Sequence, residues 1–261
     1  MNSETILSFD LDDMLMPTFE NYQLVREAFV HWVQRKFDAH LSEEEILGAV
    51  DNVDEGLIDE YGFDKERSIL AFKRGLEELG EEYGFEVSQE DLRQAEEIGR
   101  RVYLSEDEYA DNGFEEGGKE LLEYLKDKDV QMVLLTLGDE EIQRRKIRAL
   151  GLEKYFDEIK IMEEKSAEEY KEVLDDLGVE PEEVVHAGDS MRHDIIPILK
   201  AGGKAIYYNR DTEWSINNEV EDGIDKDRFL EVESLHEARE KLGFLVEEER
   251  FDELFGTGNA Y

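Results

Sequence analysis

The sequence contains no cysteine, which excludes disulfide bonds and thiolate chemistry for this chain. Its amino terminus lacks a basic stretch followed by a long apolar run, and no later segment reaches the roughly 18 apolar residues that span a bilayer. Lysine and arginine form no cluster of the size that a nucleic-acid backbone requires. We therefore expect a cytoplasmic protein that binds neither membranes nor nucleic acids.

Basic residues are scarce relative to acidic ones, with 30 against 70, and the formal net charge is -40. Apolar residues still make up 40% of the chain and aromatic residues 10%, which argues against a disordered acidic chain. Such a charge repels itself in dilute buffer, whereas at molar salt the Debye length falls to about 3 Å and the repulsion is screened. We interpret the charge as an adaptation to a salty cytoplasm, with an ordinary acidic protein as the alternative.

The spacing of apolar residues changes along the chain. Residues 5–9 form a short apolar run that ends at acidic residues, as a buried strand would. Between about residues 19 and 104 the apolar positions recur at helical spacing, which predicts a helical bundle inserted after the first strand. From Gly113 onward helices and strands alternate. The predicted strands are 130–135, 159–162, 184–187 and 205–208, and the predicted helices are 116–126, 139–150, 167–177, 194–201 and 235–242.

This alternation predicts an α/β fold, because right-handed crossovers place helices on both faces of a mostly parallel sheet. The length of 261 residues suits one such domain carrying an insertion. The boundaries that we predict are a Rossmann-like core at 1–17 and 108–240, a helical insertion at 18–107 and an acidic carboxyl-terminal tail at 241–261.

Ligands of open parallel sheets bind beyond the carboxyl ends of the strands, so the residues that follow each strand are candidates for a site. Asp10 and Asp12 follow the first predicted strand in FDLDDML. The same spacing occurs at Asp127 and Asp129, where no strand precedes, and a solvated acidic face is the alternative for any single pair. The apolar run ILSF in front of Asp10 distinguishes the first pair.

Two further strand ends carry polar residues. Thr136, in VLLTLGD, could hold an anionic oxygen through its hydroxyl and the following N–H groups, or could simply belong to a turn or helix cap. The strand EVVHA leads into GDSMRHDI, where Gly188 permits a close turn before Asp189 and Asp194. The alternative is a turn followed by a helix with Ser190 as its cap.

Together these segments resemble, in order and spacing, the four sequence motifs of the haloacid dehalogenase superfamily, over about residues 6–208. DLDDML is similar to the first motif, D-x-D-x-T/V-L, with Met14 where a small β-branched residue is usual. Thr136 corresponds to the second motif. Lys165 corresponds to the family's lysine, followed by Ser166 where a proline often stands. GDSMRHD matches the fourth motif, G-D-S-x-x-x-D, in full, and is the most specific match.

The resemblance implies a subfamily I phosphatase whose inserted helices form a cap over small substrates. It assigns Asp10 as the nucleophile that forms an aspartyl-phosphate and Asp12 as the acid/base partner. It also assigns Lys165 and Thr136 to the phosphoryl oxygens. We expect a small soluble phosphate ester as substrate and a monomer or homodimer as the assembly.

The resemblance further implies a Mg²⁺ site, because a cation can offset like charges held close together. Its ligands would be Asp10, the backbone carbonyl of Asp12 and the side chain of Asp189, with Asp194 in support. The five histidines show no metal-ligand spacing, and we expect surface or satisfied core positions for His31, His40, His186, His193 and His236.

Three other functions remain open. A 2-haloacid dehalogenase shares the fold and the nucleophile but needs no metal and lacks the second acid of the first motif, so Asp12 and Asp189 favour a phosphatase. A phosphosugar mutase of the same superfamily keeps that second acid. A non-enzymatic acidic interaction protein would carry the same aspartates as solvated charge.

Overall fold

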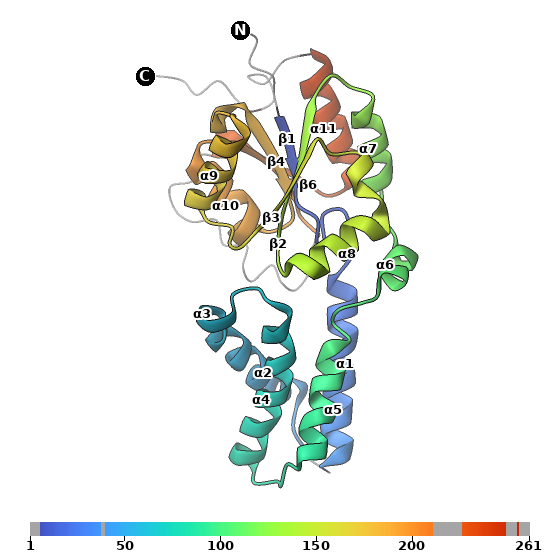
Figure 1. Cartoon of the computed structure of the whole chain (residues 1–261), viewed down its shortest axis with the longest axis vertical. Coiled ribbons are helices and arrows are strands. Elements are labelled where there is room, and N and C mark those ends of the chain that lie inside the picture. The colour runs from blue at the N-terminus through green and yellow to red at the C-terminus, as the bar shows by residue number, and fades with distance from the viewer. Residues whose placement is uncertain (1–5, 38–39, 211–225, 249–254, 256–261) are drawn as a thin grey trace. The chain divides into compact units, whose positions relative to one another are not determined.

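A computed structural model of the chain describes residues 6–37, 40–210, 226–248 and 255 (Figure 1). The chain divides into two compact units. The first comprises Met1–Pro17, Ala110–Leu137 and Lys146–Tyr261, and the second comprises Thr18–Tyr109 and Gly138–Arg145. The second unit thus contains the first part of helix α8 (Glu140–Leu150) in addition to the segment in which the sequence predicts an insertion.

The first unit is built on a parallel sheet, which among the described residues has six strands in the order β3-β2-β1-β4-β5-β6. The strands are β1 (Ile6–Phe9), β2 (Gln131–Leu137), β3 (Glu158–Met162), β4 (Val184–Gly188), β5 (Lys204–Tyr208) and β6 (Phe229–Val232). All residues of β1 and β4 are buried, as expected for inner strands covered on both faces. The predicted α/β fold with a parallel, Rossmann-like sheet is confirmed.

Helices cover both faces of this sheet. Helices α9 (Ala167–Leu177) and α10 (Ile196–Ala201) lie on one face, and α7 (Gly118–Lys126) and α11 (Leu235–Glu248) lie on the other (Figure 1). A turn of π-helix, η3 (Met191–Ile195), precedes α10. Side chains of β1, β2 and β4 pack against those of α9 and α10 in one continuous apolar cluster.

Helix α11 extends beyond its predicted end at residue 242, because Leu242 and Leu245 continue its buried apolar stripe. The first part of the predicted tail at 241–261 is therefore helical. The rest of that tail, apart from Phe255, lies outside the described residues.

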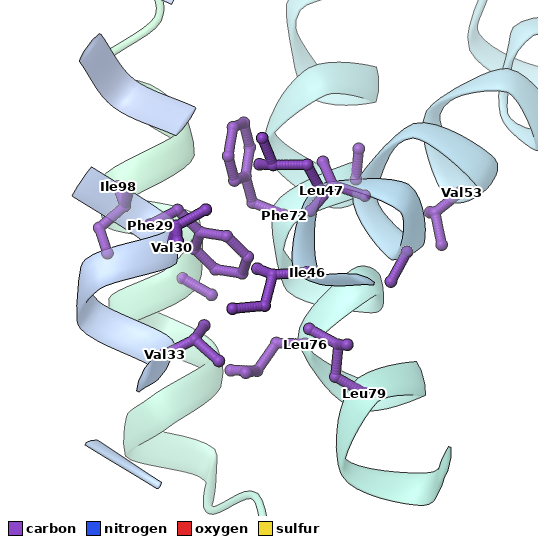
Figure 2. Packing of buried hydrophobic residues seen from close by; sticks show 14 of the residues in the cluster. Phe29, Val30, Val33, Ile46, Leu47, Val53, Phe72, Leu76, Leu79 and Ile98 are labelled. Carbon is purple, nitrogen blue, oxygen red and sulfur yellow. The ribbon is translucent and has the colours of Figure 1, made fainter. Parts of the chain in front are cut away.

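The second unit is helical. Besides the first part of α8, its elements are α1 (Phe19–Lys36), α2 (Glu43–Gly56), α3 (Ile58–Tyr61), α4 (Lys65–Tyr83), α5 (Gln89–Arg100) and the first residues of α6 (Glu106–Asn112). Figure 2 shows its apolar core, where Phe29 of α1 meets Phe72 of α4 edge to face with 5.1 Å between ring centroids. Ile46 and Leu76 are fully buried in the same cluster.

Local signals in the sequence fix where these helices start. Ser42 and Ser88 each accept a hydrogen bond from the backbone of the third helical residue, whose carboxylate reaches back to the serine N–H. Such capping boxes satisfy the N–H groups that the first turn leaves without partners.

Among the described helices, none combines the length and the apolar character that a membrane crossing requires.

Candidate active site

Asp10 lies at the carboxyl end of the central strand β1. Its backbone N–H donates to the carbonyl of Ala187 in β4 at 2.9 Å, so the sheet fixes its position. Its buried carboxylate accepts a hydrogen bond from Nζ of Lys165, at 2.6 Å from Oδ1. Lys165 follows β3 and precedes α9, whose first turn is capped by the hydroxyl of Ser166. A serine in place of the family's proline therefore still starts the helix.

Asp194 reaches the same lysine from the π-helical turn after β4. Its Oδ1 accepts from Nζ of Lys165 at 2.5 Å, and its Oδ2 accepts from the N–H of Ser190 at 3.0 Å. A Cβ atom at Gly188 would lie 2.5 Å from Cγ of Asp194, so only glycine fits there. The glycine of the GDSMRHD segment thus makes room for the last aspartate of the same segment.

Three carboxylates converge at this point. Asp10, Asp189 and Asp194 each offer an oxygen, and these oxygens all lie within 4.8 Å of one another. Such a set fits Mg²⁺, which prefers oxygen ligands. The side chain of Asp12 is not one of the three grouped carboxylates in the described part of the chain.

Burial is the main influence on the pKa values of the three clustered carboxyl groups. Burial raises the pKa of Asp10 to about 7, although Lys165 opposes the shift. Burial and the neighbouring Asp194 raise the pKa of Asp189 well above its usual range. Burial alone would also raise the pKa of Asp194, but Lys165 and His186 hold it below that range. A bound cation would favour the ionised form of all three acids.

Asp12 is paired with a second lysine. Nζ of Lys146, on α8, donates to Oδ1 of Asp12 at 2.6 Å, and Lys146 is buried. Lys146 is not among the residues predicted from the sequence. It lies between the buried Ile142 and Leu150 on one helical stripe. A lysine on an otherwise apolar stripe is the sequence signal by which this residue could have been found.

Thr136 is buried near the end of β2, two positions beyond Leu134, which pairs with Phe9 of β1. It therefore lies at the same edge of the sheet as Asp10. Asp139, further along this connection, caps α8 by accepting the N–H of Ile142 at 3.0 Å.

Comparison of the sequence with known families gives a match to a family model of haloacid dehalogenase-like hydrolases over residues 5–202. The chain belongs to this family. The resemblance inferred from the sequence motifs is thereby confirmed.

Relatives of this hydrolase extend the comparison. The N-acylneuraminate-9-phosphatase of Rattus norvegicus is 40% identical over 96 residues, which are 35% of this chain and 38% of the rat protein. The match thus spans little more than a third of that relative. A haloacid dehalogenase-like hydrolase from Xanthomonas campestris has the same fold, with a TM-score of 0.72, 22% identity and 95% of each chain covered. A phosphatase of this family from Thermococcus onnurineus aligns with a TM-score of 0.56 and 21% identity, over 92% of this chain and 98% of that one.

A buried polar network lies next to the aspartate cluster of this hydrolase. His186 of β4 has Nδ1 at 2.9 Å from Oγ of Ser8 and Nε2 at 3.2 Å from the hydroxyl of Tyr170. Nε2 is also 3.5 Å from Oδ1 of Asp194. Burial lowers the pKa of His186, which favours the neutral imidazole, and both ring nitrogens have hydrogen-bond partners. None of the five histidines joins the group of carboxylates described above within the described residues.

The loop that carries Asp12 is held on its other side by Arg210. Asp13 adopts a left-handed backbone with φ of 57°, and its Oδ1 lies 2.5 Å from Nη1 of Arg210. Nη2 of the same arginine lies 3.2 Å from Glu115. The N–H of Asp13 donates to the carbonyl of Met16 at 2.7 Å, which closes the loop.

Proposed function

We propose that this hydrolase is a magnesium-dependent phosphomonoester hydrolase that acts on a small soluble phosphate ester through an aspartyl-phosphate. The observation that carries the proposal is the cluster at the end of β1, where Lys165 contacts Asp10 and two further carboxylates come within 4.8 Å. A nucleophilic carboxylate, a fixed cation and an oxygen-only donor set are what phosphoryl transfer to an aspartate requires.

Asp10 is the proposed nucleophile. One of its carboxylate oxygens forms a bond to phosphorus while the bond from phosphorus to the ester oxygen breaks. Asp12 gives its proton to the departing alkoxide and later takes a proton from the water that hydrolyses the aspartyl-phosphate. Inorganic phosphate leaves, and both aspartates return to their initial state. The aspartyl-phosphate intermediate replaces one difficult hydrolysis by two easier displacements.

Asp10, Asp189 and the backbone carbonyl of Asp12 would hold the magnesium ion, with Asp194 in support. When bound, Mg²⁺ would neutralise charge on the phosphoryl oxygens. Lys165 already forms ion pairs with Asp10 and Asp194, and it would meet the phosphate inside an acidic protein. Thr136 is proposed to donate its hydroxyl to the same oxygens.

The relatives suggest which esters to try first. The rat relative is an N-acylneuraminate-9-phosphatase, so a phosphorylated sugar acid belongs in the first screen beside sugar phosphates, phosphoglycolate and nucleotide monophosphates. We further propose that the helical insertion at 18–107 acts as the family's cap and sets substrate choice.

The test measures p-nitrophenol release from p-nitrophenyl phosphate in high KCl, with Mg²⁺ or with EDTA. We expect magnesium-dependent turnover in the wild type and none in Asp10→Asn. Asp129→Asn is the matched control, because Asp129 has the same chemistry and charge but is exposed and outside the cluster. Acid-quenched protein that has turned over labelled ester should carry label on Asp10.

Other outcomes separate the alternatives. Chloride release from 2-chloropropionate without Mg²⁺ would identify a dehalogenase, and conversion of a sugar monophosphate in the presence of its bisphosphate would identify a mutase. A folded wild type that is inactive in all these assays, and unaffected by Asp10→Asn, would instead support an acidic interaction protein.

A further inference from the structure

The two aspartates of the first motif each contact a different lysine. Lys165 contacts Asp10 at 2.6 Å, and Lys146 contacts Asp12 at 2.6 Å. Both contacts lie within the first unit. Lys165 binds the phosphate in the proposed mechanism, whereas Lys146 has had no role in it so far.

The position of Lys146 is one at which an apolar residue would be expected. Its side chain is 9% exposed, and the neighbouring residue Ile147 and the residue one turn later, Leu150, are both buried. An ammonium group in such a place loses hydration, and the loss is offset only by a well-placed partner. Asp12 is that partner, and it is 134 residues away in sequence.

The loop of Asp12 is anchored separately from its side chain. Arg210 and the hydrogen bond from Asp13 to Met16 fix the backbone next to Asp12, whereas Lys146 contacts its Oδ1 atom. A carboxylate held at one oxygen by a buried ammonium is restricted in its orientation. Proton transfer depends on such an orientation, because donor and acceptor must come within hydrogen-bond reach.

We propose that Lys146 is a positioning residue that orients Asp12 for proton transfer to the leaving oxygen. The inference rests on the proposed phosphatase function and adds a determinant of its acid/base step. Lys146 acts through Asp12 and does not touch the reacting atoms in this account.

The first test uses the leaving group. Removing p-nitrophenolate needs little help from an acid, whereas an alkoxide needs a proton. We therefore expect Lys146→Met to lower kcat/KM for an alkyl ester such as glycerol phosphate by about tenfold or more, a part of the general-acid contribution. With p-nitrophenyl phosphate the same variant should lose no more than about threefold. Lys146→Arg, which keeps the charge, should restore part of the activity on the alkyl ester.

The second test is a double-mutant cycle with Asp12→Asn. If Lys146 acts through Asp12, adding Lys146→Met to Asp12→Asn should change kcat/KM for the alkyl ester by less than about twofold. A purely structural role would give losses that multiply. Lys171→Met is the matched control, since Lys171 is exposed on α9, and it should behave as wild type. Thermal unfolding verifies each fold, and Lys146→Gln replaces Lys146→Met if the latter does not fold.

The outcomes are distinct. Selective loss on the alkyl ester together with non-additivity supports the inference. Equal loss on both esters, no loss on either, or multiplying losses would overturn it while leaving the phosphatase function in place. A folded wild type that hydrolyses neither these two esters nor any ester of the first screen would refute the proposed function itself, and the inference with it.

Discussion

Gly188 leaves the space in which Asp194 sits, and any side chain would displace that carboxylate. In Gly188→Ala the new Cβ would lie 2.5 Å from Cγ of Asp194, which must move away from Lys165 and from the N–H of Ser190. We expect kcat/KM for the proposed phosphatase reaction to fall at least about tenfold, because Asp194 supports the proposed metal site and small displacements within an active site are costly. Steady-state kinetics and a Mg²⁺ titration measure the effect. Gly48→Ala, which meets nothing within 4 Å, is the control, and wild-type kinetics in Gly188→Ala would contradict the account.

Mg²⁺ and protons should compete for Asp10. Burial raises the pKa of Asp10 to about 7 and shifts that of Asp189 in the same direction, and a carboxylate must lose its proton to bind the ion. Affinity for Mg²⁺ should therefore fall as the pH drops below 7, by about tenfold or more between roughly pH 7.5 and 5.5. Calorimetric titration at constant KCl measures it, with Asp129→Asn as the control. An affinity that does not change with pH would show that these carboxylates are already ionised without the metal.

The sequence pointed to Asp10, Asp189 and Asp194 because each follows a recognisable buried strand. The structure brings these three together. Lys146 could not be found in the same way, because its partner Asp12 lies on another element 134 residues away. Such a contact depends on how α8 packs against the loop after β1, which no local pattern encodes.

At the level of elements, most strands were predictable from the sequence. Two elements were not, strand β6 and the π-helical turn, and each has a physical explanation. The strands β1 to β5 were expected within two residues of their observed ends. Four of them are compact apolar runs, whereas β3 is short and contains Glu158 and Lys160. Strand β6 was missed because FLEV is short, includes a charged residue and lies at the edge of the sheet. The π-helical turn Met191–Ile195 was also missed, because it is fixed by Asp194 bonding back to Ser190 rather than by apolar spacing.

The close approach of α2 and α4 depends on Gly75. A Cβ atom there would lie 3.1 Å from Cα of Val50, a backbone atom that cannot give way alone. Gly75→Ala should therefore be destabilised by about 1 kcal/mol or more, although alanine favours helix. Gly48→Ala, in open space on α2, should instead be stabilised by about 0.5–1 kcal/mol. Urea unfolding followed by circular dichroism compares the two, and a shift of the same sign in both would refute the packing argument.

For the molecule as a whole, the excess of acidic residues is placed largely outside the packed interior. Most buried positions are apolar, and the buried acids have named partners: Asp10 and Asp194 pair with Lys165, and Asp91 with Lys36 and Ser88. The fold class could thus be inferred from apolar spacing in spite of the charge, because net charge carries no information about fold.

Salt should stabilise this protein through screening. With a net charge of -40, self-repulsion is strong in dilute buffer and weak at molar salt, so the Tm should rise by more than about 5 °C between roughly 0.1 and 2 M KCl. A variant with Glu→Gln at the exposed Glu77, Glu78, Glu81 and Glu82 of α4 removes clustered charge without removing ion pairs seen in the structure. Its Tm should be higher than that of wild type in dilute buffer and should rise less with KCl. Scanning calorimetry at both KCl concentrations measures these Tm values, with sucrose in place of KCl as the uncharged control. Preferential exclusion alone would raise the Tm equally in sucrose and in KCl, and by the same amount in both proteins.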